Sequence, residues 1–148
     1  MHLSDEDKLL IDWCPIEETP KIQEFIDAHW QRDHVLARDA ELLQWQHRMP
    51  NEGGQLSVLT AHEAGRLLGI LGIIQFEFCL RGQRLSGAWL TTWVSAPEAR
   101  PKGVGLGLLK RVLDGSYAFV GTLGVSPSAL KIYGSLGFTA WEAIPRWI

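Results

Sequence analysis

The residues best suited to chemistry lie in one glycine-rich stretch, Arg100 to Gly107 (RPKGVGLG). It follows an apolar run typical of a strand and precedes an amphipathic run typical of a helix. Glycine lets a backbone turn tightly and approach a ligand, and the first N–H groups of a helix favour an anion. The pattern predicts a phosphate or pyrophosphate site, with a turn that binds nothing as the alternative. Its residues would be Arg100, Lys102, Gly103, Val104, Gly105, Leu106 and Gly107.

Two other phosphate motifs do not fit this stretch. A dinucleotide-binding turn needs G-x-G-x-x-G near the start of a βαβ unit and an acidic residue at the end of the next strand. Here the glycines are spaced G-x-G-x-G, late in the chain, and no such acid follows the next apolar run. A P-loop needs Gly-Lys-Ser/Thr, whereas Gly107 is followed by two leucines. Both motifs are therefore excluded.

A second motif lies further along the chain, from Ser126 to Phe138 (SPSALKIYGSLGF). The two stretches together resemble the signatures of the GNAT N-acetyltransferase superfamily, Arg/Gln-x-x-Gly-x-Gly/Ala followed by Asn-x-x-Ala-x-x-x-Tyr-x-x-x-Gly-Phe. Tyr133 and Gly137 stand at the expected places, whereas Ser126 replaces the usual Asn. The resemblance covers the chain from about Gln55 onward.

This resemblance implies a single α/β domain over residues 1–148 with the acyl-CoA N-acyltransferase fold, in which a mixed, mostly antiparallel sheet with splayed central strands is flanked by helices. It implies acetyl-CoA as cosubstrate and no metal. The backbone of residues 93–95, including Val94 and Ser95, would meet the pantetheine and the acyl carbonyl. Ser126 would cap its helix or touch the cofactor. Tyr133 would be the general acid, since a phenol is protonated at neutral pH; a tyrosine that only packs is the alternative.

The acceptor side of such a site needs a base for the amine proton, and the sequence leaves its identity open. Strand alternation puts Glu77 on a polar face with its neighbours at 75 and 79. His34 is a second candidate, because an imidazole titrates near neutrality. Either side chain could equally be solvated or structural. His and Trp-Gln residues at 29–34 and 45–47 resemble those of amino-sugar acetyltransferases, so we expect a small-molecule primary amine, with an amino sugar as one choice.

The composition of the chain limits the classes of partner that it could bind. The chain has 148 residues, 46% of them hydrophobic, and a net charge of −3 without any basic run, which argues against nucleic acid. The longest apolar run, Leu67–Ile74, is too short to cross a bilayer, and Met1–Lys8 lacks a signal-peptide pattern. We therefore expect a cytoplasmic protein with no membrane partner. Cys14 and Cys79 have no metal or disulfide spacing and should be buried thiols.

Periodicity and turn residues predict the order β-α-α-β-β-β-α-β-α-β. We expect strands over 9–13, 56–62, 66–78, 84–95, 117–124 and 139–148, turns over 51–54 and 63–65, and helices that start at 20 (capped by Thr19), 39, 104 and 127 (capped by Ser126). Two function classes remain: an acyl-CoA-dependent N-acetyltransferase acting on a small amine, and a non-catalytic acyl-CoA-binding or partner domain. Because only ten residues follow Phe138, where the family usually adds two strands, a homodimer partner or a missing second domain is a further expectation.

Overall fold

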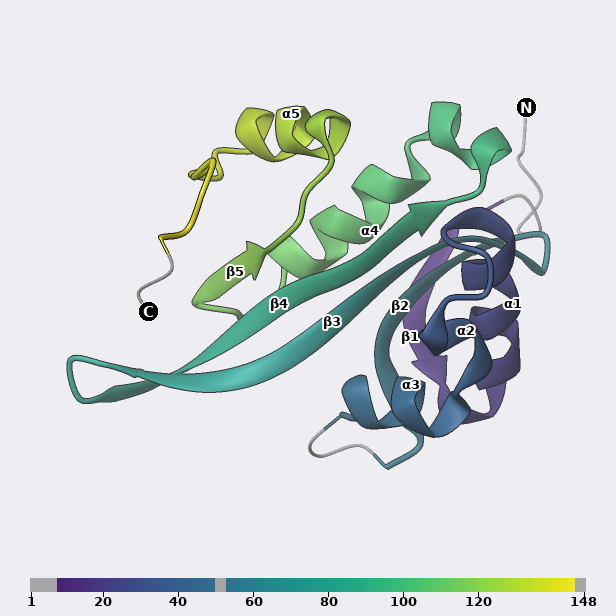
Figure 1. Cartoon of the computed structure of the whole chain (residues 1–148), viewed down its shortest axis with the longest axis horizontal. Helices are drawn as coiled ribbons and strands as arrows, with labels where there is room; N and C mark the ends of the chain where they lie inside the picture. The colour runs from purple at the N-terminus through teal and green to yellow at the C-terminus, as the bar shows by residue number, and fades with distance from the viewer. Residues whose placement is uncertain (1–7, 50–52, 146–148) are drawn as a thin grey trace.

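Five strands form one sheet in the order β1-β2-β3-β4-β5 in the computed structural model, which describes residues 8–49 and 53–145 (Figure 1). Neighbours from β1 to β4 run antiparallel, and β5 lies parallel to β4. This confirms the expected α/β class with a mixed, mostly antiparallel sheet. The strands are Leu10–Pro15 (β1), Gln55–Glu63 (β2), Arg66–Leu80 (β3), Gln83–Ser95 (β4) and Phe119–Thr122 (β5).

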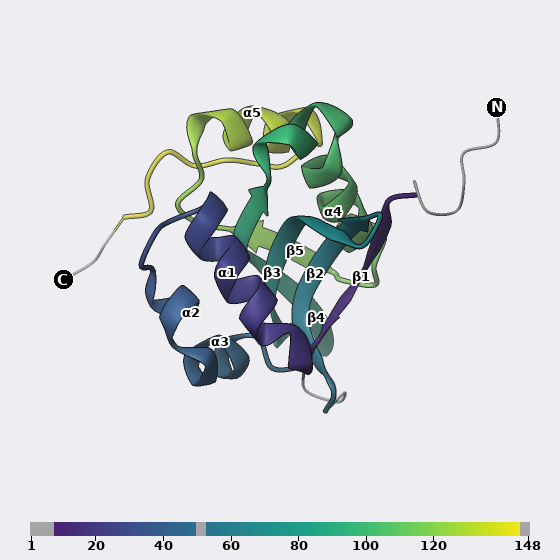
Figure 2. The same cartoon turned by 90° about the vertical axis from the view of Figure 1, so that its right-hand side faces the viewer.

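Helices flank the sheet on both faces (Figures 1 and 2). A Cβ added at Gly72 would meet His47 at the end of α3, whereas one added at Gly69 would meet Val104 and Leu108 of α4. The helices that begin the chain therefore lie opposite α4. They are Ile16–Glu18 (η2, 3-10), Thr19–His29 (α1), Val35–Arg38 (α2) and Ala40–Gln46 (α3); the later ones are Pro97–Lys102 (η3, 3-10), Val104–Leu113 (α4) and Pro127–Ser135 (α5).

The middle of the sheet is covered on both sides, so its strands are buried in continuous runs rather than at alternate residues. Residues 56–61 of β2 and 68–73 of β3 are all buried. Leu59 and Leu71 from these strands and Leu108 from α4 are fully buried. The far ends of β3 and β4 leave this core and project as a two-stranded hairpin (Figure 1).

β4 and its neighbour β5 part at a bulge in β4. Leu71 pairs with Trp93 and Ile73 with Leu90. Between these two pairs β4 contains two residues, Thr91 and Thr92, where β3 contains one, which is a β-bulge. The parallel pairing of β4 with β5 ends at the same point, with Leu90 opposite Thr122. Beyond it β4 continues to Ser95 while β5 has ended. The expected splay of the central strands is confirmed.

Several local predictions were wrong. Thr19 is the first residue of α1 rather than its cap, and its hydroxyl donates to the Ile16 carbonyl at 2.6 Å. Residues 139–145 contain no strand, and 146–148 lie outside the described residues, as do 51 and 52 of the expected turn. Cys79 is exposed because it lies on the projecting hairpin, whereas Cys14 is buried as expected. Burial raises the pKa of the Cys14 thiol to about 12.

Candidate active site

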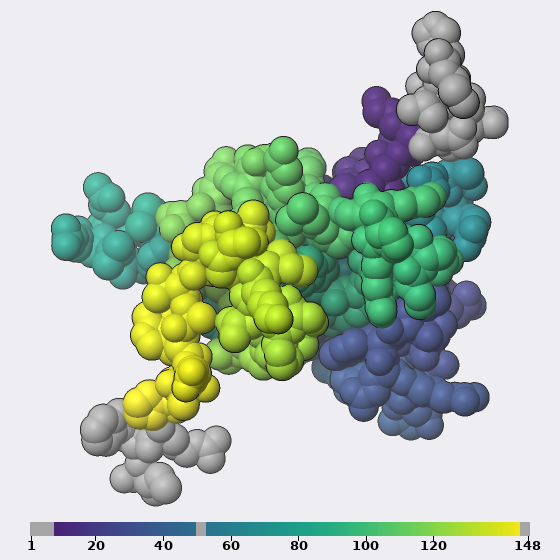
Figure 3. Space-filling view, turned by 90° about the horizontal axis from the view of Figure 1, so that it is seen from above, coloured from purple at the N-terminus to yellow at the C-terminus, as the bar shows by residue number. Residues whose placement is uncertain are grey.

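A cleft with a volume of ≈ 450 Å³ opens where β4 and β5 diverge. Figure 3 looks onto this end of the molecule and shows a hollow between α5 (yellow-green) and the helical segment α1–α3 (blue). The first helices, the bulge of β4 and the β5–α5 connection line it. Its residues are Trp30, His34, Val35, Leu36, Leu42, Gln46, Thr91, Thr92, Trp93, residues 122–126, Ala129 and Tyr133.

The backbone of β4 presents unpaired groups where it passes the end of β5. The Ala96 N–H donates to the Leu68 carbonyl at 2.9 Å, which makes this a hydrogen-bonded pair of the antiparallel ladder. Bonded and non-bonded pairs alternate, so Val94 bonds toward β3 while the backbones of Trp93 and Ser95 point away from it. Since β5 no longer covers that side, Trp93 and Ser95 are available to an extended ligand. Val94 is placed otherwise than expected: its backbone is used in the ladder and its side chain is buried.

The glycine stretch turns from η3 into α4, and Gly103 makes the turn with φ 72°, which a residue with a side chain adopts only at a cost. The Gly103 N–H bonds to the Arg100 carbonyl and the Gly107 N–H to the Gly103 carbonyl. The amides that precede the first helical bond are therefore those of Val104, Gly105 and Leu106. The amides free to bind an anion are thus three, whereas the predicted phosphate site ran from Gly103 to Gly107.

The turn is joined to the cleft by Trp93, whose indole N–H donates to the Gly105 carbonyl at 3.0 Å. A Cβ on Gly105 would lie 3.1 Å from Ser95 Oγ, so the helix start and the end of β4 are in close approach. Arg100 and Lys102 are both exposed beside the turn. Lys102 is held in an ion pair by Glu63 at the end of β2.

Tyr133 lies between α5 and the sheet, with its ring against Trp93 and Phe138 (centroid distances 5.4 and 5.0 Å). The side chain is 5% exposed and lines the cleft. Burial raises the pKa of the Tyr133 phenol to about 12, an effect that a hydrogen bond with Thr122 only partly offsets. The phenol is therefore protonated throughout the physiological range and can donate a proton or a hydrogen bond into the cleft.

Ser126 stands at the start of α5 and also lines the cleft. Its Oγ accepts a hydrogen bond from the Ala129 N–H at 3.3 Å, which is the N-cap interaction expected from the sequence. Ser128 Oγ lies 3.2 Å away. The hydroxyl thus has a structural role, and it remains within reach of the cleft.

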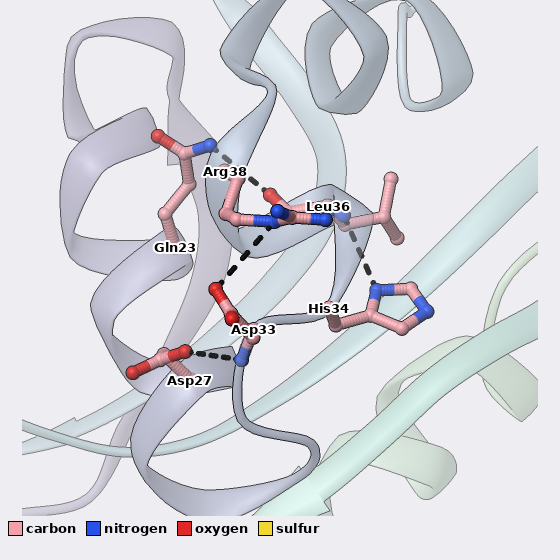
Figure 4. Close-up of polar contacts among 6 residues, drawn as sticks. All are labelled: Gln23, Asp27, Asp33, His34, Leu36 and Arg38. Carbon is pink, nitrogen blue, oxygen red and sulfur yellow. Dashed lines mark hydrogen bonds and ion pairs between the residues drawn. The ribbon is translucent and has the colours of Figure 1, made fainter.

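His34 lines the opposite wall as the N-cap of α2 (Figure 4). Its Nδ1 accepts a hydrogen bond from the Leu36 N–H at 3.2 Å. The ring also packs against Trp30, with centroids 4.5 Å apart. Of the other residues singled out at 29–34 and 45–47, Trp30 and Gln46 reach the cleft, whereas His47 is buried and Trp45 is 75% exposed.

Glu77 is not part of this site. It lies on the projecting β3–β4 hairpin, is exposed, and its carboxylate pairs with Arg84 at 3.4 Å. The strand alternation was read correctly, but β3 has already left the body of the protein at this residue, so its polar face meets solvent. Among the described residues no Asp, Glu, Lys or Arg lines the cleft.

Two threonines of the β4 bulge belong to the site and were missed by sequence reasoning. Thr91 and Thr92 both line the cleft, and the Thr91 Oγ1 is buried without a hydrogen-bond partner in the part of the chain that the structure describes. Buried hydroxyls are normally hydrogen-bonded, so this one stands out among the residues that line the cleft. A polar Thr-Thr pair inside an otherwise apolar strand was the available signal, whereas the bulge that directs it has no sequence signature.

No helix in the described ranges is long and apolar enough to span a membrane. No group of three or more His, Cys, Asp or Glu side chains within those ranges is arranged to hold a metal ion.

Comparison with protein-family models gives one match over most of the chain. Residues 16–141 match the family model described as acetyltransferase (GNAT) domain. The curated proteins give no match.

Solved structures of low sequence identity share the fold. A putative acetyltransferase from Agrobacterium tumefaciens has a TM-score of 0.72 at 13% identity, with 94% of this chain and 99% of that chain covered. Glucosamine-6-phosphate N-acetyltransferase from Arabidopsis thaliana has a TM-score of 0.69 at 12% identity (95% and 98% covered). An aminoglycoside acetyltransferase from an uncultured soil sample, in complex with sisomicin, has 0.67 at 18% (95% and 94% covered).

Proposed function

The chain belongs to the GNAT acetyltransferase family, and we propose that it transfers an acetyl group from acetyl-CoA to a primary amine of a small molecule. One observation carries the proposal: the cleft at the bulge of β4 is lined by Trp93 and the buried Tyr133, and the Trp93 indole bonds to Gly105 at the start of α4. An extended donor and a compact acceptor would meet in this cleft.

The proposed donor site has the chemistry that acetyl-CoA requires. The three amides at the start of α4 would hold the pyrophosphate, with the positive end of the helix dipole behind them and Arg100 beside them. The backbone groups of Trp93 and Ser95 would bond to the amides of the pantetheine arm, as a neighbouring strand would. Gly105 lets these two parts come close together.

The reaction needs little from side chains. The amine nitrogen would attack the thioester carbonyl carbon, the C–N bond would form and the C–S bond break, and the proton lost by the nitrogen would pass to solvent in the cleft. Tyr133 would give its proton to the departing thiolate, for which a phenol kept neutral by burial is in the correct state. The Thr91 hydroxyl and the β4 backbone would orient the acyl group, and such orientation supplies much of the rate in reactions of this type.

The acceptor would enter between Trp30, His34 and Tyr133. Two of the structural neighbours are an aminoglycoside acetyltransferase and a glucosamine-6-phosphate N-acetyltransferase. An amino sugar is therefore a reasonable acceptor for this chain. We place the reaction in the cytoplasm, where acyl-CoA is available.

A second function is favoured by the absence of carboxylates from the cleft among the described residues. A domain that binds acyl-CoA without turnover would keep the α4 amides that bind the pyrophosphate and would need no base. It differs from the enzyme in one measurable property, the release of free CoA.

The test incubates the protein with acetyl-CoA and a panel of amines that includes amino sugars, and follows thiol release. Turnover that is lost in Tyr133→Phe supports the transferase. Thermal stabilisation by CoA without turnover supports the binding domain, because a ligand selective for the folded state raises its stability. Absence of both effects would refute the acyl-CoA assignment.

A further inference from the structure

The acceptor end of the cleft, defined here as its lining residues outside 93 and 122–133, has an unusual charge pattern. It combines apolar walls with neutral polar groups, and among the described residues no charged side chain faces it. Its members are Trp30, His34, Val35, Leu36, Leu42, Gln46, Thr91 and Thr92.

Carboxylates are present close by, but they are used to hold the helical segment together (Figure 4). Asp27 accepts a hydrogen bond from the Asp33 N–H at 2.7 Å, and Asp33 pairs with the Arg38 guanidinium at 3.6 Å. Asp39 caps α3 through the Leu42 N–H at 2.9 Å. Figure 4 shows the His34 ring on the other side of the segment from Asp27 and Asp33. An ammonium group bound in the cleft would therefore have no counter-charge.

His34 does not supply a base in this conformation. Its Nδ1 lone pair accepts the Leu36 N–H, so the neutral ring carries its proton on Nε2. In that tautomer Nε2 is a hydrogen-bond donor.

The Gln46 side chain supplies a hydrogen-bond acceptor instead, and its contact with His47 sets the orientation of its amide group. An amide nitrogen only donates, so at 3.2 Å from Gln46 Nε2 the His47 Nε2 must accept. His47 Nδ1 then carries the proton and donates to the Ile73 carbonyl at 3.3 Å. Burial lowers the pKa of His47 and so favours this neutral ring. The Gln46 carbonyl oxygen is left to receive an N–H of the acceptor.

We infer that the acceptor is a primary amine of low basicity, next to an electron-withdrawing group, on a body that carries no further charge. It binds as the free amine, with its N–H directed to an uncharged acceptor such as the Gln46 carbonyl and its apolar side against Val35, Leu36 and Leu42. The inference rests on the proposed transferase function. It disfavours both polycationic and phosphorylated acceptors, because the acceptor end offers neither kind a counter-charge.

The size of the effect follows from the free-amine fraction. At pH 7.4 an alkylamine as basic as lysine is uncharged in only about one molecule in a thousand, whereas an amine with the basicity of a peptide α-amino group is uncharged in about one in three. A site that selects the free amine should therefore separate the two classes by about two orders of magnitude. The titratable groups that face the bound amine are His34 from the helical wall and Tyr133 from α5, and none comes from α3, β4 or residues 122–126.

A matched pair of acceptors tests this. Phenylalaninamide and phenethylamine share an aromatic body and differ by the carboxamide that lowers the basicity of the first. We expect kcat/KM with saturating acetyl-CoA at pH 7.4 to favour phenylalaninamide by about 100-fold, and the preference to shrink to under about tenfold at pH 10. Glucosamine should likewise exceed glucosamine 6-phosphate and sisomicin.

The outcomes are distinct. Equal kcat/KM for the matched pair at pH 7.4, or a preference for sisomicin or the phosphorylated sugar, would overturn the inference and leave the transferase assignment standing. No turnover with any of the five amines would overturn the transferase assignment itself.

A variant pair tests the role of charge directly. Val35 lines the cleft and is 45% exposed, so a longer polar side chain is accommodated there. Val35→Glu should raise kcat/KM for phenethylamine about tenfold over Val35→Gln, because only the carboxylate can bind the ammonium form and take its proton to leave the free amine. Equal values for the two variants, with both proteins folded by circular dichroism, would show that the missing carboxylate does not set the preference.

Discussion

The proposed donor site would be built from backbone groups, whereas the proposed acceptor end of the cleft would be built from side chains. On the donor side the ligand would meet the amides of α4 and the main chain of Trp93 and Ser95. On the acceptor side it would meet Gln46, Thr91 and the apolar walls. A backbone site keeps its chemistry while side chains vary, provided that nothing fills the space of the ligand. A side-chain site changes its ligand with each substitution, which is how one fold serves many acceptors.

Tyr133 lies where the two ends meet, and its removal should have the largest effect. Tyr133→Phe keeps the ring packed against Trp93 and Phe138 but removes the proton donor. We expect kcat to fall by about 10²–10⁴ with little change in KM for either substrate. Steady-state kinetics measure this, and Tyr117→Phe, which alters the other tyrosine of the chain, is the matched control. A loss below about fivefold would assign Tyr133 to packing.

The pH profile gives an independent check on the same residue. An ordinary tyrosine is half ionised near pH ~10, but burial raises the pKa of Tyr133 to about 12. Because its pKa is raised, Tyr133 keeps its proton to a higher pH than an ordinary tyrosine. We therefore expect no fall in kcat between pH 8 and 10 from ionisation of this residue. A decline centred near pH 10 that is absent in Tyr133→Phe would contradict it.

The donor end should be sensitive to filled space and charge at its backbone. In Gly105→Glu a side chain and a negative charge enter where the amides would meet phosphate, beside Ser95 and Trp93. We expect acetyl-CoA affinity by calorimetry to fall at least about 100-fold, equivalent to about 2.7 kcal/mol. Gly53→Glu adds the same charge at a position with nothing within 4 Å of the new Cβ. Unchanged affinity in Gly105→Glu would remove the pyrophosphate from this turn.

The same difference explains what could be predicted from the sequence. The glycine turn before α4 could be predicted because it requires glycine at fixed positions, as at Gly103, and the register of the motif around Tyr133 follows from one helix. The acceptor end could not. Whether His34 or Glu77 reaches the cleft depends on where β3 leaves the core and how α2 is capped, and both are decided by tertiary packing.

The order of elements was predictable for a similar reason, since periodicity is local. The bulge at Thr91–Thr92 was not, because it arises from the register of β3 against β4. The strand expected over 139–148 is absent from residues 139–145. A strand needs a neighbour, and a sequence does not show which edge is open.

The packing of Gly72 against Thr91 and His47, beneath the acceptor end of the cleft, gives the next test, which measures the free energy of unfolding. A Cβ on Gly72 would overlap Thr91 Oγ1 and lie 2.7 Å from His47 Cε1, so both groups depend on this glycine for space. Gly72→Ala should lower the free energy of unfolding by about 1–3 kcal/mol, measured by urea denaturation. Gly134→Ala in α5, where nothing lies within 4 Å of the added Cβ, should be neutral or slightly stabilising. Equal stability of the two variants would mean that this packing is loose.

The smallest effect should come from a cationic side chain of the donor end, and it bears most directly on the contrast between the two ends. Lys102 is held by Glu63, so Lys102→Ala removes an exposed ion pair worth at most about 1 kcal/mol and leaves the α4 amides intact. We expect its acetyl-CoA affinity to change by less than about threefold, and that of Arg100→Ala, which has no such ion pair among the described residues, by no more than about tenfold. Calorimetry at one fixed salt concentration compares the two. A loss in Lys102→Ala as large as that in Gly105→Glu would mean that side-chain charge, rather than the backbone, holds the donor.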